Sequence, residues 1–108
     1  MKNFVIAAAS GALLLISSQG IAANIEAGKK KAAEVCAACH GPDGNSPAPA
    51  FPKIAGQHAS YIEKSLNEYK SGARKDPIMA GMAAALSKED IENLAAYFAS
   101  QSGLKTKY

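Results

Sequence analysis

Apolar residues recur along much of the chain at intervals of three and four. The two clearest runs are Ile62, Leu66 and Tyr69 in one segment, and Ile91, Leu94, Ala95 and Phe98 in a later one. These intervals place side chains on one face of an α-helix. After residue 23, no stretch alternates apolar and polar residues as a half-buried strand would. The pattern therefore predicts an all-α protein.

Each predicted helix begins with a residue that can cap it. A first helix is expected from Ile25 to Cys36, with Asn24 as its N-cap and several lysines and alanines that favour helix. Two later helices each begin with a serine followed three residues on by an acidic residue, which is the capping-box pattern: Ser60 with Glu63, and Ser87 with Asp90. We therefore expect three main helices.

The first 23 residues are typical of a secretory signal peptide. One lysine precedes an uncharged run from Phe4 to Ala23, which has an apolar centre and small residues at its end. A retained membrane anchor is the alternative, but serines and glycines make the run a poor spanning helix. We expect cleavage of residues 1–23 and export to the periplasm, which leaves residues 24–108 as one domain without stable membrane insertion.

A long connection separates the first two predicted helices. Residues 41–57 contain four of the chain's five prolines, and a structureless loop of this length is unusual in a small domain. A domain of this size also commonly needs a disulfide, a metal or a cofactor to complete its core. A loop that wraps a large flat cofactor would account for both features. The mild net charge of +3 and the lack of basic runs interleaved with aromatic residues argue against nucleic-acid binding.

The segment "CAACH" contains both cysteines of the chain, Cys36 and Cys39, followed directly by His40. This is the pattern of covalent c-type haem attachment, in which two thiols form thioethers with the haem vinyl groups and the histidine becomes the proximal iron ligand. A thioredoxin-type dithiol would need β-α-β surroundings. A zinc site would have to recruit the distant His58, and a disulfide would leave His40 unexplained. The motif predicts one covalently bound haem c.

Three segments, "CAACHGPDGNSPAP", "FPKIAGQ" and "LAAYFASQ", resemble those of class I cytochromes c, and specifically the c-553-type proteins and one half of the dihaem cytochromes c4. The resemblance covers essentially all of residues 24–108. It implies the cytochrome c fold around one haem with histidine and methionine axial ligands. It also implies that the carbonyl of Pro52 accepts the other N–H of His40, and that the first and last helices cross at Gly28, close to an aromatic residue such as Tyr97. Ala32 departs from the family, where an aromatic residue is common.

Two methionines are candidates for the distal iron ligand. Met82 lies four residues before Leu86, as in a short buried helical face. Met79 follows Asp76-Pro77-Ile78, and because proline disfavours helix in the residue before it, we expect Met79 on an extended loop. The resemblance implies a ligand eight residues before the serine that caps the last helix, which is Met79. We predict that Met79 is the ligand and that Met82 belongs to the core.

The resemblance implies a soluble one-electron carrier rather than an enzyme. Its redox partners would be a membrane complex or dehydrogenase as donor and an oxidase or reductase as acceptor. Three competing functions stay open on the sequence. They are a haem sensor or peroxidase-like protein with an open sixth iron position, a haem subunit of a larger redox enzyme, and a thiol oxidoreductase with free thiols.

Overall fold

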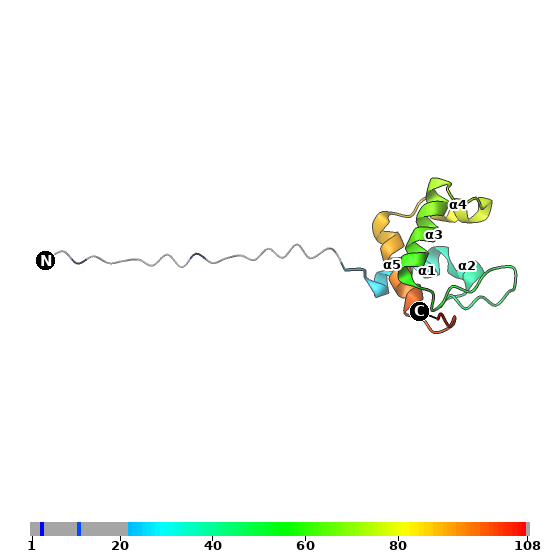
Figure 1. Cartoon of the computed structure of the whole chain (residues 1–108), viewed down its shortest axis with the longest axis horizontal. Helices are drawn as coiled ribbons and strands as arrows, with labels where there is room; N and C mark the ends of the chain where they lie inside the picture. Colours follow the sequence, from blue (N-terminus) through cyan, green and yellow to red (C-terminus); the bar gives the residue numbers. More distant parts are fainter. Residues whose placement is uncertain (1–2, 4–10, 12–21, 108) are drawn as a thin grey trace.

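The computed structural model describes residues 3, 11 and 22–107 and contains, within them, five helices and no strand. The helices are α1 Ile25–Val35, α2 Ala37–His40, α3 Ala59–Ser71, α4 Pro77–Ala83 and α5 Lys88–Ala99 (Figure 1). The all-α prediction is confirmed, and the three expected helices correspond to α1, α3 and α5. Most of the predicted signal peptide lies outside the described residues, so its cleavage stays a prediction. Within the described ranges, no helix is long and apolar enough to cross a membrane.

Helices α1 and α5 pack closely, and Gly28 lies at their crossing, as the resemblance to class I cytochromes c implies. A Cβ atom at Gly28 would lie 2.1 Å from the carbonyl oxygen of Asn93 and 2.9 Å from the Cβ of Tyr97. The side chain of Asn93 also accepts a hydrogen bond from the backbone N–H of Asn24, at 2.7 Å. Because Gly28 lacks a side chain, the two helix backbones can approach this closely.

The predicted caps are confirmed for two of the three main helices. The Asn24 side chain accepts the backbone N–H of Ala27 at 3.0 Å, and Ser87 and Asp90 form both hydrogen bonds of a capping box. The capping box predicted at Ser60 is wrong. Helix α3 begins at Ala59, and its N-cap position is His58, two residues before Ser60, so the Ser60 hydroxyl is already within the first turn and makes no capping bond.

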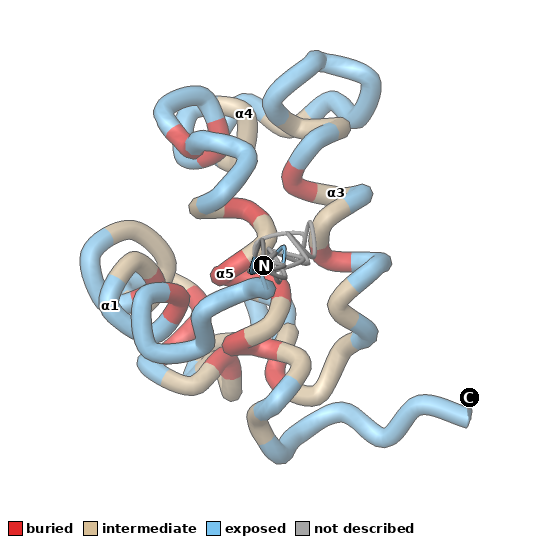
Figure 2. Tube along the Cα trace, turned by 90° about the vertical axis from the view of Figure 1, so that its left-hand side faces the viewer, coloured by how far each residue is buried: buried red, intermediate tan, exposed pale blue. Residues whose placement is uncertain are grey.

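The buried side chains gather mainly along α5, which packs against both α1 and α3 (Figure 2). The largest fully buried residues are Phe98, Ile91 and Leu94, all from α5. Helix α3 contributes Ile62 and Leu66 to the same cluster. Because the core is small, the fold depends on what fills the space between α3, α4 and the segment after α2.

The connection of residues 41–57 is fastened to α5 and to the chain beyond it. The carbonyl of Gly44 accepts the N–H groups of Ile54 and Ala55, at 2.8 and 3.1 Å. The N–H of Gly56 donates to the Phe98 carbonyl at 2.9 Å, and the Tyr97 hydroxyl donates to the carbonyl of Pro42 at 2.7 Å. These bonds hold the long loop in one conformation beside the end of α5.

Candidate haem site

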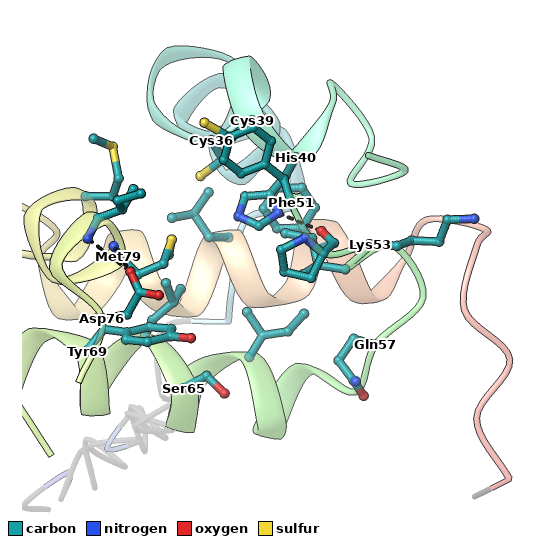
Figure 3. A pocket seen from close by; sticks show the side chains of 18 of the residues that line it. Cys36, Cys39, His40, Phe51, Lys53, Gln57, Ser65, Tyr69, Asp76 and Met79 are labelled. Carbon is teal, nitrogen blue, oxygen red and sulfur yellow. Dashed lines mark hydrogen bonds between the residues drawn. The ribbon is translucent and has the colours of Figure 1, made fainter. Parts of the chain in front are cut away.

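A cavity of about 390 Å³ lies between α2, the long loop, α3, α4 and α5. Its walls include all the residues that the sequence singles out for haem binding: Cys36, Cys39, His40, Pro52, Met79 and Met82. Figure 3 shows Cys36, Cys39 and His40 on one side of the cavity, and Met79 across it, beside Tyr69 and Asp76. Apolar side chains of α3 and α5, including Leu66, Leu94 and Phe98, complete the lining.

The two cysteines are presented by a break between α1 and α2. Cys36 is the single residue between the two helices, and its carbonyl accepts the N–H groups of Cys39 and His40, at 3.2 and 3.0 Å. This turn places both thiols on the cavity wall, half-buried and not joined to each other. Burial raises the pKa of the Cys36 thiol to about 11. Since a reactive thiol needs a lowered pKa, this environment does not favour a thiol oxidoreductase.

His40 has one ring nitrogen committed to the loop. Its Nδ1 lies 2.8 Å from the carbonyl oxygen of Pro52, which is the contact that the resemblance implies. A carbonyl can only accept, so Nδ1 carries the proton and Nε2 keeps its lone pair. The ring is buried, at 8% exposure, and lines the cavity. This is the arrangement of a metal-ligating histidine, because the second hydrogen bond fixes the ring and raises its basicity.

Met79 lies in the first turn of α4, so the extended loop predicted for it is wrong. Asp76, the residue before Pro77, is extended, and its carboxylate accepts the N–H groups of Ile78 and Met79 at 3.0 and 2.9 Å. Pro77 then takes the first helical position, where its fixed φ favours helix. Pro77 therefore disfavours helical backbone only at Asp76, and the helix can begin at Pro77 itself. An Asp-Pro pair is itself a helix-start signal, and it could have located both α4 and the capping role of Asp76.

Met82 is 45% exposed, so its predicted place in the core is wrong. Helix α4 ends at Ala83, and Leu86 lies beyond it. The spacing of four between Met82 and Leu86 therefore does not place them on one helix face. Ala83 is the buried residue of this short helix. Met79 is partly buried against the core cluster and is the more enclosed of the two methionines.

The donor set and the cavity fit a haem. Two thiols, an imidazole nitrogen with a free lone pair and a thioether line one apolar cavity, and the two axial candidates come from opposite walls. Histidine with methionine is a typical axial pair for haem iron in electron-transfer proteins. His58, the remaining histidine, is not among the lining residues and instead occupies the N-cap position of α3, without a capping bond from its side chain.

Comparisons with known proteins agree with this geometry. A family model described as cytochrome c matches residues 25–102. Cytochrome c4 of Stutzerimonas stutzeri is 50% identical over 91 residues, which cover 76% of this chain and 43% of that protein. The "thiosulfate dehydrogenase electron acceptor" of S. stutzeri strain A1501 is 43% identical over 102 residues, which cover 89% of this chain and 47% of that protein.

A solved structure shows the same fold. The crystal structure of reduced recombinant cytochrome c4 from Pseudomonas stutzeri matches with a TM-score of 0.71 and 50% identity, over 77% of this chain and 48% of that one. The chain thus spans about half the length of these relatives. Proteins of this family bind haem c covalently. The chain belongs to the cytochrome c family and is a relative of the cytochromes c4.

Proposed function

We propose that this chain is a monohaem electron carrier that passes single electrons between redox proteins and is not itself an enzyme. In this proposal Cys36 and Cys39 hold the haem through thioethers, and His40 and Met79 are the axial ligands. The observation that carries the proposal is the bond between His40 Nδ1 and the Pro52 carbonyl, at 2.8 Å, in a cavity whose opposite wall presents Met79.

Each of these residues has a distinct physical task. The bound haem iron would supply the one-electron redox chemistry. The bond to Pro52 fixes the tautomer of the neutral His40 ring, so Nε2 is the nitrogen that would bind the iron. The Met79 thioether is a soft donor that favours the ferrous state and therefore raises the potential. The capping bonds from Asp76 hold the first turn of α4 in place, which keeps the Met79 sulfur at the cavity.

We further propose that the chain acts in the periplasm, with a membrane complex or dehydrogenase as donor and an oxidase or reductase as acceptor. The signal-peptide pattern of residues 1–23 supports export. A relative with the printed description "thiosulfate dehydrogenase electron acceptor" supports a dehydrogenase as one class of donor.

The proposal is tested by adding carbon monoxide to the reduced holoprotein and following its visible spectrum. The unmodified protein should show no rapid change, because Met79 would hold the sixth iron position. The Met79→Ala variant should bind carbon monoxide at once. Met82→Ala is the matched control, since it removes a methionine from the same helix, and it should behave like the unmodified protein.

Two results would contradict the assignment. Rapid carbon monoxide binding by the unmodified protein would mean an open or weakly held sixth position, which favours a sensor or peroxidase-like protein. Carbon monoxide binding by Met82→Ala together with none by Met79→Ala would transfer the ligand role to Met82.

A further inference from the structure

Helix α4, which carries Met79, has little apolar packing of its own to hold it in place. Within this helix only Ala83 is buried, whereas Ile78 and Met82 are exposed and Met79 is partly buried against the core cluster. A buried alanine contributes little to stability, because the gain from burial scales with the apolar area removed from water. The position of α4 beside α3 therefore depends on the polar contacts at its two ends.

The end of α4 that lies away from Asp76 is held by a lysine of α3. The Nζ of Lys70 donates a hydrogen bond to the carbonyl of Leu86, in the short connection between α4 and α5. The N–H of Leu86 in turn donates to the carbonyl of Ala83, the last residue of α4, at 3.1 Å. A bond at Leu86 therefore restrains the end of α4 as well as the connection.

The carbonyl of Leu86 needs a donor from outside the helices. Leu86 is 4% exposed, and the backbone ladder of α5 begins one residue later, with the bond from the Ile91 N–H to the Ser87 carbonyl at 3.0 Å. A buried carbonyl without a donor is destabilising. A charged donor makes the stronger kind of hydrogen bond, so Lys70 satisfies this carbonyl well.

The ammonium group of Lys70 has no carboxylate partner that would compete for it. None of the ion pairs between described residues includes Lys70. Its charge still acts at the start of α5: the pKa of Asp90 is lowered, mainly by its bond to the backbone of Ser87 and in smaller part by the charges of Lys31 and Lys70. Lys70 thus lies where α3, the end of α4 and the start of α5 meet.

We propose that Lys70 is a positioning residue for the sixth iron ligand, because its bond to the Leu86 carbonyl ties the end of α4 to α3. This inference rests on the proposed ligation of the iron by Met79. The Asp76 cap keeps the first turn of α4 in shape, whereas the Lys70 bond joins α4 to its neighbour. A movement of α4 away from the cavity would withdraw the Met79 sulfur and would break the Lys70 bond.

The test measures the affinity of the ferric holoprotein for imidazole, which competes with Met79 for the sixth position. It compares the unmodified protein with Lys70→Leu, Lys70→Arg and Lys64→Leu. Lys64→Leu is the matched control, since it makes the same change on the same helix, at a side chain that is 66% exposed and pairs with Glu68 of that helix. The charge-transfer band of methionine-ligated ferric haem is recorded for each protein, because it reports the iron–Met79 bond directly.

Lys70→Leu should bind imidazole about threefold to tenfold more tightly, as expected when one partly exposed charged hydrogen bond no longer opposes the opening of α4. Its charge-transfer band should also fade at a lower temperature. Lys70→Arg can donate to the same carbonyl, so its affinity should stay within about twofold of the unmodified protein. Lys64→Leu should likewise change the affinity by less than about twofold. When Met79→Ala is already present, Lys70→Leu should have an effect of less than about twofold, because Met79 no longer competes.

Equal imidazole affinities for Lys70→Leu and Lys64→Leu would overturn the inference, and a normal charge-transfer band in the unmodified protein would then leave the carrier proposal standing. An undiminished effect of Lys70→Leu in the presence of Met79→Ala would also overturn it, since Lys70 would not act through that ligand. Failure of the proposed function gives a different result: the unmodified protein and Met79→Ala would bind imidazole equally, and both proposals would end. If Lys70→Leu does not fold, Lys70→Gln, with its shorter uncharged side chain, provides the same comparisons.

Discussion

Replacing Gly28 by alanine tests the tightest contact of the fold. The added methyl would lie 2.1 Å from the carbonyl oxygen of Asn93, well inside van der Waals distance, and 2.9 Å from the Cβ of Tyr97. Both atoms belong to, or are bonded directly to, the backbone of α5, so neither can swing aside. Helix α1 must therefore move away from α5, which opens the interface that holds the two ends of the domain together.

The expected loss follows from two opposing terms. Overpacking of a rigid site costs typically about 1–3 kcal/mol and sometimes more, and because the obstacles here are backbone atoms we expect about 3–4 kcal/mol. Alanine in place of glycine within a helix returns about 1 kcal/mol. The net loss of unfolding free energy is then about 2–3 kcal/mol. For a domain of this size that lowers Tm by about 10–20 °C.

The measurement is guanidinium unfolding of the holoprotein, followed by far-ultraviolet circular dichroism. Gly81→Ala is the matched control, because Gly81 lies within α4 and, apart from its chain neighbours and the backbone of its own helix, no described atom lies within 4 Å of where its Cβ would be. That variant should gain about 0.5–1 kcal/mol. An unfolding free energy for Gly28→Ala within about 0.5 kcal/mol of the unmodified protein would refute the close approach of α1 and α5.

Three further predictions concern caps and a buried hydroxyl. Ser87→Ala should cost about 1 kcal/mol of unfolding free energy in urea titrations, whereas Ser60→Ala should cost less than about 0.5 kcal/mol, because of these two serines only Ser87 makes a capping bond. Equal losses would contradict the start of α3 at Ala59. Asp76→Ala should bind added imidazole about fivefold more tightly in spectral titrations, because the loss of about 1 kcal/mol from the cap loosens Met79, and Asp76→Asn should not. Burial raises the pKa of Tyr97, so the stability that the neutral hydroxyl contributes is complete below the ordinary tyrosine pKa of about 10 and is lost as pH rises through the raised value. The Tyr97→Phe variant should therefore lose less unfolding free energy than the unmodified protein between about pH 9 and 11. An unchanged slope of unfolding free energy against pH would exclude Tyr97 as the cause of the loss.

Helices α3 and α5 could be predicted from the sequence because each buries apolar residues at helical spacing, whereas α1 is predicted from its Asn24 cap and its helix-forming residues. Helix α5 buries Ile91, Leu94 and Phe98, and this spacing is visible without a structure. Helix α4 buries only Ala83, so hydrophobic periodicity cannot reveal it. The sequence signal for α4 is the capping residue Asp76 followed by Pro77, and both are local features that do not depend on burial.

The candidate site likewise has some features that the sequence predicts and others that it does not. The spacing of Cys36, Cys39 and His40 is fixed by the size of a porphyrin, so the motif alone points to the cofactor. The exposure of Met82 depends on where α4 ends. The stacking of Arg74 on Tyr69 depends on how the chain turns after α3. Such contacts arise from tertiary packing, and no pattern of residues along the chain encodes them directly.

The cavity walls follow a definite order along the chain, and this order bears on how the protein matures. The proposed attachment residues Cys36 to His40 emerge early during synthesis, whereas Met79 and Phe98 follow tens of residues later. Attachment of a haem to these thiols would therefore be possible before α4 and α5 complete the cavity walls. In this order the proposed sixth ligand, Met79, would join last. Chains caught between these two events would carry haem but would react with small gaseous ligands.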